Sequence, residues 1–433
     1  MHKRRTFIGF TLTLGLLGSL VLWRQAQFTT AQAATGSAYT KLPSKANAGG
    51  LAAPLVFATF TVTNTGDNGG VNPAANAGTG TLRQAIVDAN ASPGADAIVF
   101  DLGTGTPSIA LAAALPTITD PVTLSGNTGG ATRVELNGAG AGGSANGLRI
   151  TAGNSTIEGL VINRFGQSGI LLQTNGSNII RNCYIGTNAS GLTALANAGS
   201  GIRIESASNT IGGTTAGERN LISGNRDNGM RIFGTAATDN KVSGNYIGTD
   251  VNGTAALANP GGGIRIESAP NNTIGGTSAA ERNVISGQTG LGTAGFGVFV
   301  TGGTASGNKI SGNYIGVDAS GLTALGNFAS GVYIEAAPNN TIGGSTTAER
   351  NIIAGNKQPG VLIRSTGATG NKVSGNYIGT DVNGTTALGN AGGGIRIESA
   401  ANNTIGGTSA AERNVISGNS GYGVLLTGTA ASG

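Results

Sequence analysis

A near-perfect internal repeat constrains the fold of this chain more than any other feature. The segment from Gly261 to Gly287 recurs from Gly392 to Gly418 with a single difference, Pro270 against Ala401. The motif YIG also returns, in steps of 62, 68 and 63 residues, at Tyr184, Tyr246, Tyr314 and Tyr377. Such a period is typical of solenoids, in which each unit buries its apolar face only against its neighbours.

Each repeat divides into two coils, because a glycine followed by alternating apolar residues occurs twice in it. These segments begin at Gly147, Gly169, Gly201, Gly229, Gly263, Gly297, Gly331, Gly360, Gly394 and Gly423. In the segment GIRIE, the period of two places Ile202 and Ile204 inside and Arg203 and Glu205 outside. Each coil has three apolar triplets, too short for helices. Stacked about 4.8 Å apart, they predict an all-β fold, a parallel β-helix or solenoid.

Asparagine and cysteine occupy related positions in the repeat. Asparagines at the turns are expected to form side-chain amide ladders between coils, and those singled out are Asn225, Asn245, Asn313, Asn356, Asn376 and Asn419. The only cysteine, Cys183, stands in RNCYIG where later copies read SGNYIG. We therefore expect a small buried residue in a structural position and no internal disulfide.

The composition agrees with many short strands and tight turns. Glycine occurs 78 times without a Gly-X-Y period, which excludes collagen, and only 10% of residues are charged. The hydrophobic fraction of 38% suffices for a core, so wholesale disorder is not expected.

Residues 1–33 are predicted to be an export signal, followed by a linker over 34–54. The basic run His2–Arg5 precedes an apolar stretch, Thr6–Trp23, and Ala31–Ala33 offers a cleavage pattern. The run RRTFIGF also fits a twin-arginine signal; a general secretory signal and a retained anchor are the alternatives. We expect a secreted, periplasmic or cell-surface protein with no membrane span after the signal is removed.

Removing the signal changes the charge balance. Four of the 25 basic residues and none of the 20 acidic ones leave with it, so the net charge falls close to +1. No nucleic-acid partner is therefore predicted. The only histidine, His2, leaves as well, which excludes a histidine-dependent mechanism in the remaining chain.

From residue 147 to 433 the motifs NYIGTD, ERNVISGN and GIRI resemble those of right-handed parallel β-helix repeat proteins. The stretch Gly80–Phe100 also resembles the segment named for its Cys-Ser-Leu-Arg-Glu-Ala signature, found before such repeats in secreted bacterial proteins. Leu82, Arg83 and Ala85 match that signature, whereas Gly80, Thr81 and Gln84 depart from it. A short helix over 81–90 is expected to cap the first coil within an N-terminal region of irregular coils, 55–146. The last residues match the start of a coil, so we expect a longer natural chain or a covered end.

The resemblance includes pectate and alginate lyases, polygalacturonases and uronate epimerases, whose sites lie on the outer face of one sheet. The corresponding column here contains Arg203, Arg231 and Arg265, flanked by Glu205 and Glu267. One hypothesis is a groove for an acidic polysaccharide, with the arginines binding carboxylates. The other is a ladder of surface Arg–Glu pairs. The ladder is favoured, because glutamate recurs at every second coil and the signatures of polygalacturonases and pectate lyases are absent.

The loops after NYIG and the ERN motifs are further candidates. Asp-x-Asn-Gly resembles half of a calcium loop, and the oxygen ligands would come from Asp250, Asn252, Asp318, Asp381 and Asn383. Asn-Gly is also a common turn, so calcium is only an alternative to a simple turn. The Glu-Arg pairs of the ERN motifs are expected to form a ladder of surface ion pairs, as in Glu281-Arg282.

Two functions remain open from the sequence. The favoured one is a non-catalytic stalk, adhesin or ligand-display rod of the cell envelope or exterior, because copying coils adds length and valency. Its partner would be an extracellular polysaccharide or another cell-surface ligand. The alternative is a polysaccharide lyase or hydrolase acting on uronate polymers on the first sheet. Phe233, Phe299 and Tyr333 are expected to form a small aromatic platform there.

Overall fold

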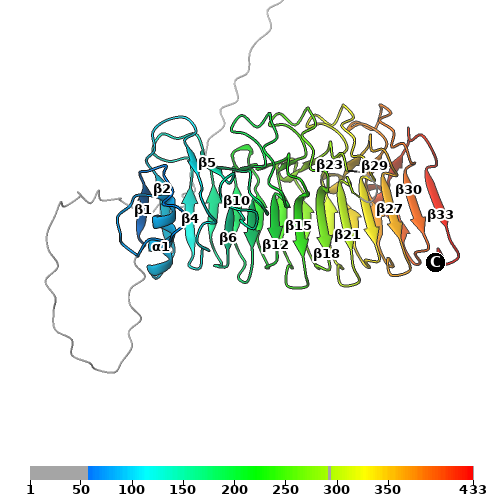
Figure 1. The fold of residues 1–433 in the computed structure, drawn as a ribbon. Coiled ribbons are helices and arrows are strands. Elements are labelled where there is room, and N and C mark those ends of the chain that lie inside the picture. The colour runs from blue at the N-terminus through cyan, green and yellow to red at the C-terminus, as the bar shows by residue number, and fades with distance from the viewer. Residues whose placement is uncertain (1–56, 291–293, 433) are drawn as a thin grey trace, which may run out of the picture. The chain divides into compact units, whose positions relative to one another are not determined.

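The computed structural model describes residues 57–290 and 294–432. They form a right-handed parallel β-helix of three sheets, in which every strand pairing is parallel (Figure 1). From residue 122 onward, each coil adds one strand to each sheet. The predicted fold class is confirmed. The predicted signal over 1–33 and linker over 34–54 lie outside the described residues. No helix among the described residues has the length and hydropathy to span a membrane.

The strands are short because each coil turns three times. The twelve-strand sheet consists, in order, of β1 (Thr59–Val62), β2 (Asp96–Phe100), β4 (Val122–Ser125), β7 (Thr156–Glu158), β10 (Ile179–Arg181), β13 (Thr210–Gly212), β16 (Lys241–Ser243), β19 (Thr273–Gly275), β22 (Lys309–Ser311), β25 (Thr341–Gly343), β28 (Lys372–Ser374) and β31 (Thr404–Ile405). The eleven-strand sheet consists of β3 (Ser108–Ala110), β5 (Val134–Asn137), β8 (Leu160–Asn163), β11 (Tyr184–Ile185), β14 (Leu221–Ile222), β17 (Tyr246–Ile247), β20 (Val284–Ile285), β23 (Tyr314–Ile315), β26 (Ile352–Ile353), β29 (Tyr377–Ile378) and β32 (Val415–Ile416).

The ten-strand sheet contains all ten segments predicted from the Gly-apolar pattern. They are β6 (Leu148–Ile150), β9 (Ile170–Leu172), β12 (Ile202–Ile204), β15 (Asn228–Phe233), β18 (Gly262–Glu267), β21 (Val298–Thr301), β24 (Val332–Glu335), β27 (Val361–Arg364), β30 (Ile395–Glu398) and β33 (Val424–Thr427). Four single-turn 3-10 helices interrupt the coils, at η1 (Ala216–Glu218), η2 (Ala279–Glu281), η3 (Thr347–Glu349) and η4 (Ala410–Glu412).

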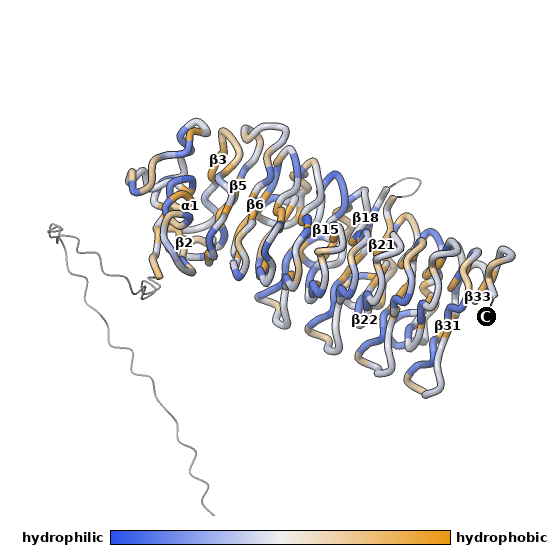
Figure 2. The backbone as a smooth tube through the Cα atoms, turned by 90° about the horizontal axis from the view of Figure 1, so that it is seen from below, coloured by the Kyte–Doolittle hydropathy of each residue, from blue (hydrophilic) through white to orange (hydrophobic). Residues whose placement is uncertain are grey.

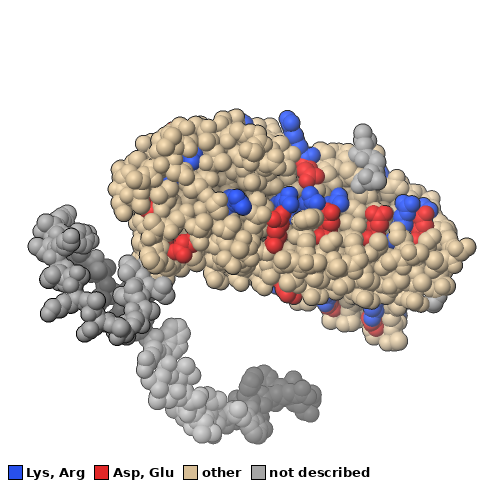
Figure 3. Space-filling view, turned by 60° about the horizontal axis from the view of Figure 1, so that its bottom comes forward, with Lys and Arg blue, Asp and Glu red and all other residues tan. Residues whose placement is uncertain are grey.

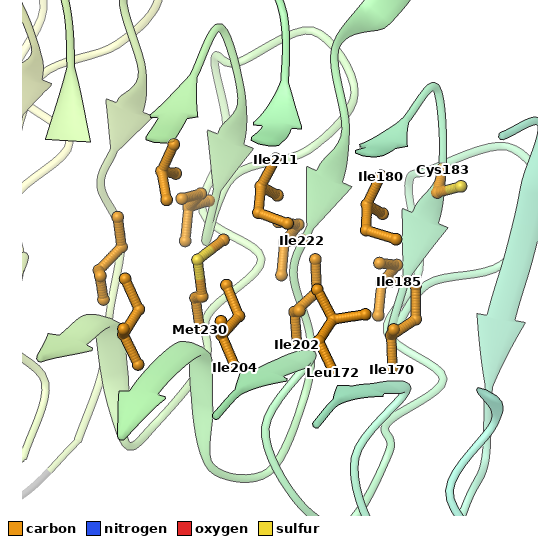
Figure 4. Close-up of a cluster of buried hydrophobic side chains, with 14 of the residues drawn as sticks. Ile170, Leu172, Ile180, Cys183, Ile185, Ile202, Ile204, Ile211, Ile222 and Met230 are labelled. Atoms are coloured by element: carbon orange, nitrogen blue, oxygen red, sulfur yellow. The ribbon is translucent and has the colours of Figure 1, made fainter. Parts of the chain in front are cut away.

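The core is a set of stacked aliphatic columns. Ile202 and Ile204 are fully buried, as predicted, and face Ile211 and Ile222 from the other two sheets (Figure 4). Hydrophobic and hydrophilic positions recur from coil to coil along the backbone (Figure 2). Burial of each isoleucine contributes about 1.5–3 kcal/mol, and only the neighbouring coils provide that burial.

Three amide ladders run along the corners of the β-helix. At the asparagines, a side-chain Nδ2 donates to the side-chain oxygen of the next coil, as from Asn245 to Asn283 at 3.0 Å. Gln288 in the first ladder accepts through Oε1 and donates to Asn327 Oδ1 through its backbone amide instead. The first ladder comprises Asn197, Asn225, Asn259, Gln288, Asn327, Asn356, Asn390 and Asn419. The second comprises Asn220, Asn245, Asn283, Asn313, Asn351, Asn376 and Asn414.

The third ladder was not among the predicted positions. It comprises Asn178, Asn209, Asn240, Asn272, Asn308, Asn340, Asn371 and Asn403. The six asparagines chosen from the sequence belong to the first and second ladders, so the ladder prediction is confirmed but covered two corners of three. Glycine is required beside a ladder where φ is positive. At Gly275, with φ of 91°, a Cβ would lie 1.9 Å from the Ser311 carbonyl oxygen.

The helix α1 (Leu82–Ala91) covers the apolar N-terminal end of the coils (Figure 1). Thr81 caps it by accepting a hydrogen bond from the Gln84 amide, and Leu82 and Ile86 are only 1% exposed. The predicted helix is confirmed to within one residue. It follows β1 rather than preceding the first strand, and it connects β1 to β2, which pair with each other.

Cys183 stands at the start of the second ladder. Its backbone amide donates to Asn220 Oδ1 at 3.0 Å, as an asparagine would at this position, and the side chain is fully buried. The structural role predicted from the sequence is confirmed, and the thiol is free.

We expect the Cys183 thiol to be unreactive in the folded protein. Burial raises its pKa to about 12, so almost no thiolate exists at pH 8. A thiol reagent such as 5,5′-dithiobis(2-nitrobenzoate) should label fewer than about one molecule in ten per hour when folded, and all molecules in 6 M guanidinium chloride. Rapid labelling of the folded protein at pH 8 would show that this coil opens readily.

Candidate functional site

The outer face of the ten-strand sheet carries the predicted site residues in two adjacent columns. Strand pairing sets Arg203 opposite Arg231 and Arg231 opposite Arg265, which is the register expected from the repeat. Phe299 continues this column, and Phe233, Glu267 and Thr301 follow one another in the next. Basic side chains thus line up beside acidic ones along one face of the protein (Figure 3).

Each predicted site glutamate is bound to the arginines beside it. Arg203 forms an ion pair with Glu205. Glu267 Oε2 lies 2.8 Å from Arg231 Nη2 and 3.0 Å from Arg265 Nε. The glutamate side chains are 19% and 25% exposed, less than those of Arg203 and Arg265 at 36%. The five residues are therefore brought together as ion pairs, although the buried Nε atoms of Arg203 and Arg231 have no hydrogen-bond partner among the described residues.

An aromatic ring packs against the first two arginines. Phe233 takes the place of a glutamate, and the guanidinium carbons of Arg203 and Arg231 lie 5.3 and 4.7 Å from its ring centroid. Arg265 lies 5.2 Å from the Phe299 ring in the same way. Such contacts fix planar guanidinium groups against the sheet.

The expected aromatic platform is wrong in both membership and exposure. Phe299 and Tyr333 stack with centroids 4.8 Å apart, and Phe296 packs against them at 5.2 and 5.0 Å. Their exposures are only 9%, 6% and 7%, and Phe233 belongs to the arginine group instead. Phe296 belongs to residues 288–296, which lengthen the coil between Gly263 and Gly297, and the sequence does not show how its ring packs. These rings form a small covered cluster.

Tyr333 is the one residue of these three aromatic side chains with a hydroxyl that could take part in proton transfer. Its hydroxyl donates to Glu335 Oε1 at 2.7 Å. Burial, and then the neighbouring Glu335 carboxylate, raise the pKa of Tyr333 above its usual value. The phenol therefore stays protonated and is not a base at neutral pH.

The candidate calcium loops are closed by their own hydrogen bonds. Asp250 Oδ1 accepts from the amides of Thr254 and Ala255 at 2.8 and 3.1 Å, and Asn252 donates its amide to Asp250 Oδ2. Asn188 closes the loop of an earlier coil without any charge. Asp318, Asp381 and Asn383 repeat the arrangement of Asp250 and Asn252.

This geometry favours a turn over a calcium loop. The aspartate accepts backbone amides, the asparagine presents a donor rather than an oxygen, and each candidate set belongs to a separate loop. Within the described residues, no group of three or more His, Cys, Asp or Glu side chains is placed to hold a metal ion.

The prediction of Glu–Arg ion pairs in the ERN motifs is wrong. Glu281 turns back to accept from Ser278 Oγ at 2.9 Å, which closes η2, and pairs with Lys241 Nζ at 2.6 Å. Arg282 points to the eleven-strand sheet, where its guanidinium lies 4.2 Å from the centroid of Tyr314. Adjacent residues at this bend point in different directions, so they cannot pair.

Lysines, which were not among the predicted site residues, pair with these glutamates. On the outer face of the twelve-strand sheet, threonine and lysine alternate from coil to coil, in the order Thr210, Lys241, Thr273, Lys309, Thr341, Lys372 and Thr404. The ion pairs are Lys241–Glu281, Lys309–Glu349 and Lys372–Glu412. The signal was present in the sequence, because each lysine precedes a VSGNYIG or ISGNYIG motif and each threonine lies in NTIGG or TIGG.

No protein-family model matches this sequence, and no curated protein matches it significantly. Among solved structures, the Dettilon tailspike protein gp208 is 19% identical over 85% of this chain and 68% of its own, with a TM-score of 0.49. The A-module of the Azotobacter vinelandii mannuronan C-5 epimerase AlgE4 is 14% identical over 81% of this chain and 95% of its own, with a TM-score of 0.40. Pectate lyase Pel9A is 15% identical over 87% of this chain and 79% of its own, with a TM-score of 0.31. Likeness of this degree says nothing of activity, which has to be argued from the residues of this chain.

Proposed function

We propose that this protein is an exported, non-catalytic β-helical rod that serves as a stalk, adhesin or ligand-display surface, with a polysaccharide as its ligand. Export rests on the predicted signal over 1–33. In the proposed organisation, residues 55–146 form the N-terminal cap and first coils and residues 147–433 form the repeating rod.

One observation carries the non-catalytic assignment. On the outer face of the ten-strand sheet, Glu205 and Glu267 are bound to arginines, and Glu398 pairs with Arg396 at 3.2 Å in a later coil. A general base must be able to receive a proton from the substrate, and a catalytic site needs an acid and a base with different surroundings. Glutamates held by arginines in this way do not provide that difference in surroundings.

The lyase or hydrolase alternative keeps one supporting feature. Arg203, Arg231 and Arg265 follow one another without interruption, so the strands that carry these three guanidinium groups lie about 4.8 Å apart. Guanidinium groups bind carboxylates and stabilise negative charge that develops in a transition state.

An activity assay separates the two functions. The purified protein would be incubated with polygalacturonate, alginate and neutral glycans, with and without calcium. Ultraviolet absorbance reports unsaturated lyase products, and a reducing-end assay reports hydrolysis. We expect no turnover. Turnover that is lost in R203A, R231A or R265A and retained in R396A, a matched Arg–Glu pair in the same column, would replace the rod proposal with the enzyme.

A further inference from the structure

A polar groove lies on the outer face of the twelve-strand sheet, away from the arginine columns. Its volume is about 410 Å³, and Lys241, Thr273, Lys309, Glu281 and Ser311 are among its lining residues. Strand register places Thr273 between the two lysines. The ammonium groups therefore project from coils about 9.6 Å apart, on either side of a threonine hydroxyl.

The lysines in this groove are held in place but retain free hydrogen-bond donors. Among the described residues, Lys241 Nζ makes one hydrogen bond, to Glu281 Oε1 at 2.6 Å, and Lys309 Nζ makes one, to Glu349. An ammonium group carries three donors. The glutamates are used more fully, since Glu281 Oε2 accepts from Thr277 N at 3.0 Å and Ser278 Oγ at 2.9 Å.

Burial shows which charge faces the solvent. The side chains of Lys241 and Lys309 are 43% and 38% exposed, whereas Glu281 and Glu349 are only 12% and 9% exposed. Hydrogen bonds from Lys241 lower the pKa of Glu281, so that this carboxylate stays ionised and holds the lysine. The outermost charge of each pair is thus positive.

A second observation points to a ligand in the groove. The Ser311 side chain lines it and is 1% exposed, yet within the described part of the chain its hydroxyl has no hydrogen-bond partner. A buried hydroxyl without a partner is unfavourable by about 1–3 kcal/mol, so a ligand that hydrogen-bonds to Ser311 would gain from satisfying it.

The lysine–glutamate pairs recur along the sheet. Lys372 pairs with Glu412 as Lys241 and Lys309 pair with their glutamates, at steps of two coils. An extended polymer lying along this face would meet an ammonium group about every 9.6 Å, and weak contacts would add through multivalency. The ammonium groups favour anionic substituents on that polymer, and the hydroxyls of Thr273 and Ser311 favour sugar hydroxyls beside them.

We propose that the lysine groove of the twelve-strand sheet binds an extended acidic polysaccharide, whose carboxylate or sulfate groups contact Lys241, Lys309 and Lys372. This inference rests on the proposed function, because it names the binding surface and the class of glycan. Asp239 at the rim of the groove is an exposed carboxylate that would repel such a ligand.

The test compares two triple variants that remove the same charge from different sheets. K241Q/K309Q/K372Q changes the groove and keeps a donor for each glutamate, and R203Q/R231Q/R265Q changes the arginine column. Binding to polygalacturonate, dextran sulfate and unmodified dextran would be measured by calorimetry at low and high salt, after circular dichroism confirms folding. The first two polymers distinguish carboxylate from sulfate recognition.

We expect the lysine variant to bind the anionic polymer about tenfold more weakly and the arginine variant to bind it as the wild type does. D239N should bind about twofold more tightly, because it removes a repulsive charge. Loss of binding in the arginine variant alone would overturn the groove and leave the glycan-binding rod intact. Unchanged binding in both triple variants would likewise overturn the groove, and a wild type that binds no glycan would overturn both proposals.

Discussion

Replacing Arg83 by methionine should lower the free energy of unfolding of the N-terminal coils by about 3–5 kcal/mol, the usual effect of breaking a buried ion pair. Arg83 and Asp67 have side chains that are 1% and 2% exposed and are joined by two hydrogen bonds, at 2.7 and 2.9 Å. The other guanidinium donors reach Asn72 Oδ1 and the carbonyl oxygens of Ala113 and Ala114. Methionine fills a similar volume but donates to none of these acceptors, of which Asp67 Oδ2 keeps the Ala112 amide as a partner at 2.8 Å.

The measurement is guanidinium chloride unfolding, with hydrogen exchange to locate the loss in α1 and β1, because a solenoid can unfold in segments. R149M is the matched control: Arg149 is exposed and donates to Gln173, so we expect a change within about 0.5 kcal/mol. Equal unfolding midpoints for R83M and R149M would contradict the assigned role of Arg83.

The effect of R83M should also depend on pH. Burial alone would raise the pKa of Asp67, but hydrogen bonds from Arg83 and Ala112 and the charge of Arg83 hold it below its usual value. A carboxylate with a lowered folded pKa contributes stability above its unfolded pKa of about 3.9, and that stability is lost as the pH falls through the folded value. The difference between wild type and R83M should therefore be largest near neutral pH and shrink below about pH 4.

Substituting Asn283 by alanine should have an effect of similar size in the middle of the rod, about 3–5 kcal/mol, since several buried polar groups lose their partners at once. Asn283 Nδ2 donates to Val242 O at 2.8 Å and to Asn313 Oδ1 at 2.9 Å. Its Oδ1 accepts from the backbone and side-chain amides of Asn245, both at 3.0 Å. All of these asparagines are buried, so water cannot replace the lost hydrogen bonds.

Asn414→Ala is the control for this prediction. Asn414 ends the same ladder among the described residues and is only partly buried, so water can reach the groups that it leaves unpaired. We expect a loss of about 1 kcal/mol for N414A by chemical denaturation. If N283A were no more destabilising than N414A, the ladders would be a consequence of coil stacking and not a source of stability.

The repeating part of the fold could be predicted because short sequence patterns within each coil determine it. The alternation in GIRIE decides that Ile202 is buried and Arg203 faces outward, and the repeat decides which residue lies above which. Cys183 could be placed in a ladder for the same reason, since it replaces an asparagine in an aligned copy. At the N-terminus, Leu82, Arg83 and Ala85, which carry the resemblance to the secreted bacterial segment, are all buried in the cap.

Pairing across coils could not be predicted in the same way. Lys241 and Glu281 are 40 residues apart, and their contact depends on how far η2 projects from the stack. The sequence motif predicts that Glu281 pairs with its neighbour Arg282, but the bend at η2 directs the two side chains to different sheets. The site columns were predicted correctly in register, whereas the packing of Phe299 against Phe296 leaves no mark in the repeat pattern.

The most direct test of the account is a calorimetric titration of the wild-type protein with polygalacturonate at neutral pH. A display rod gives heats that decline to zero as its sites saturate, with no unsaturated product in the recovered solution. A steady heat that continues after each injection, accompanied by ultraviolet absorbance, would show turnover and contradict the non-catalytic rod.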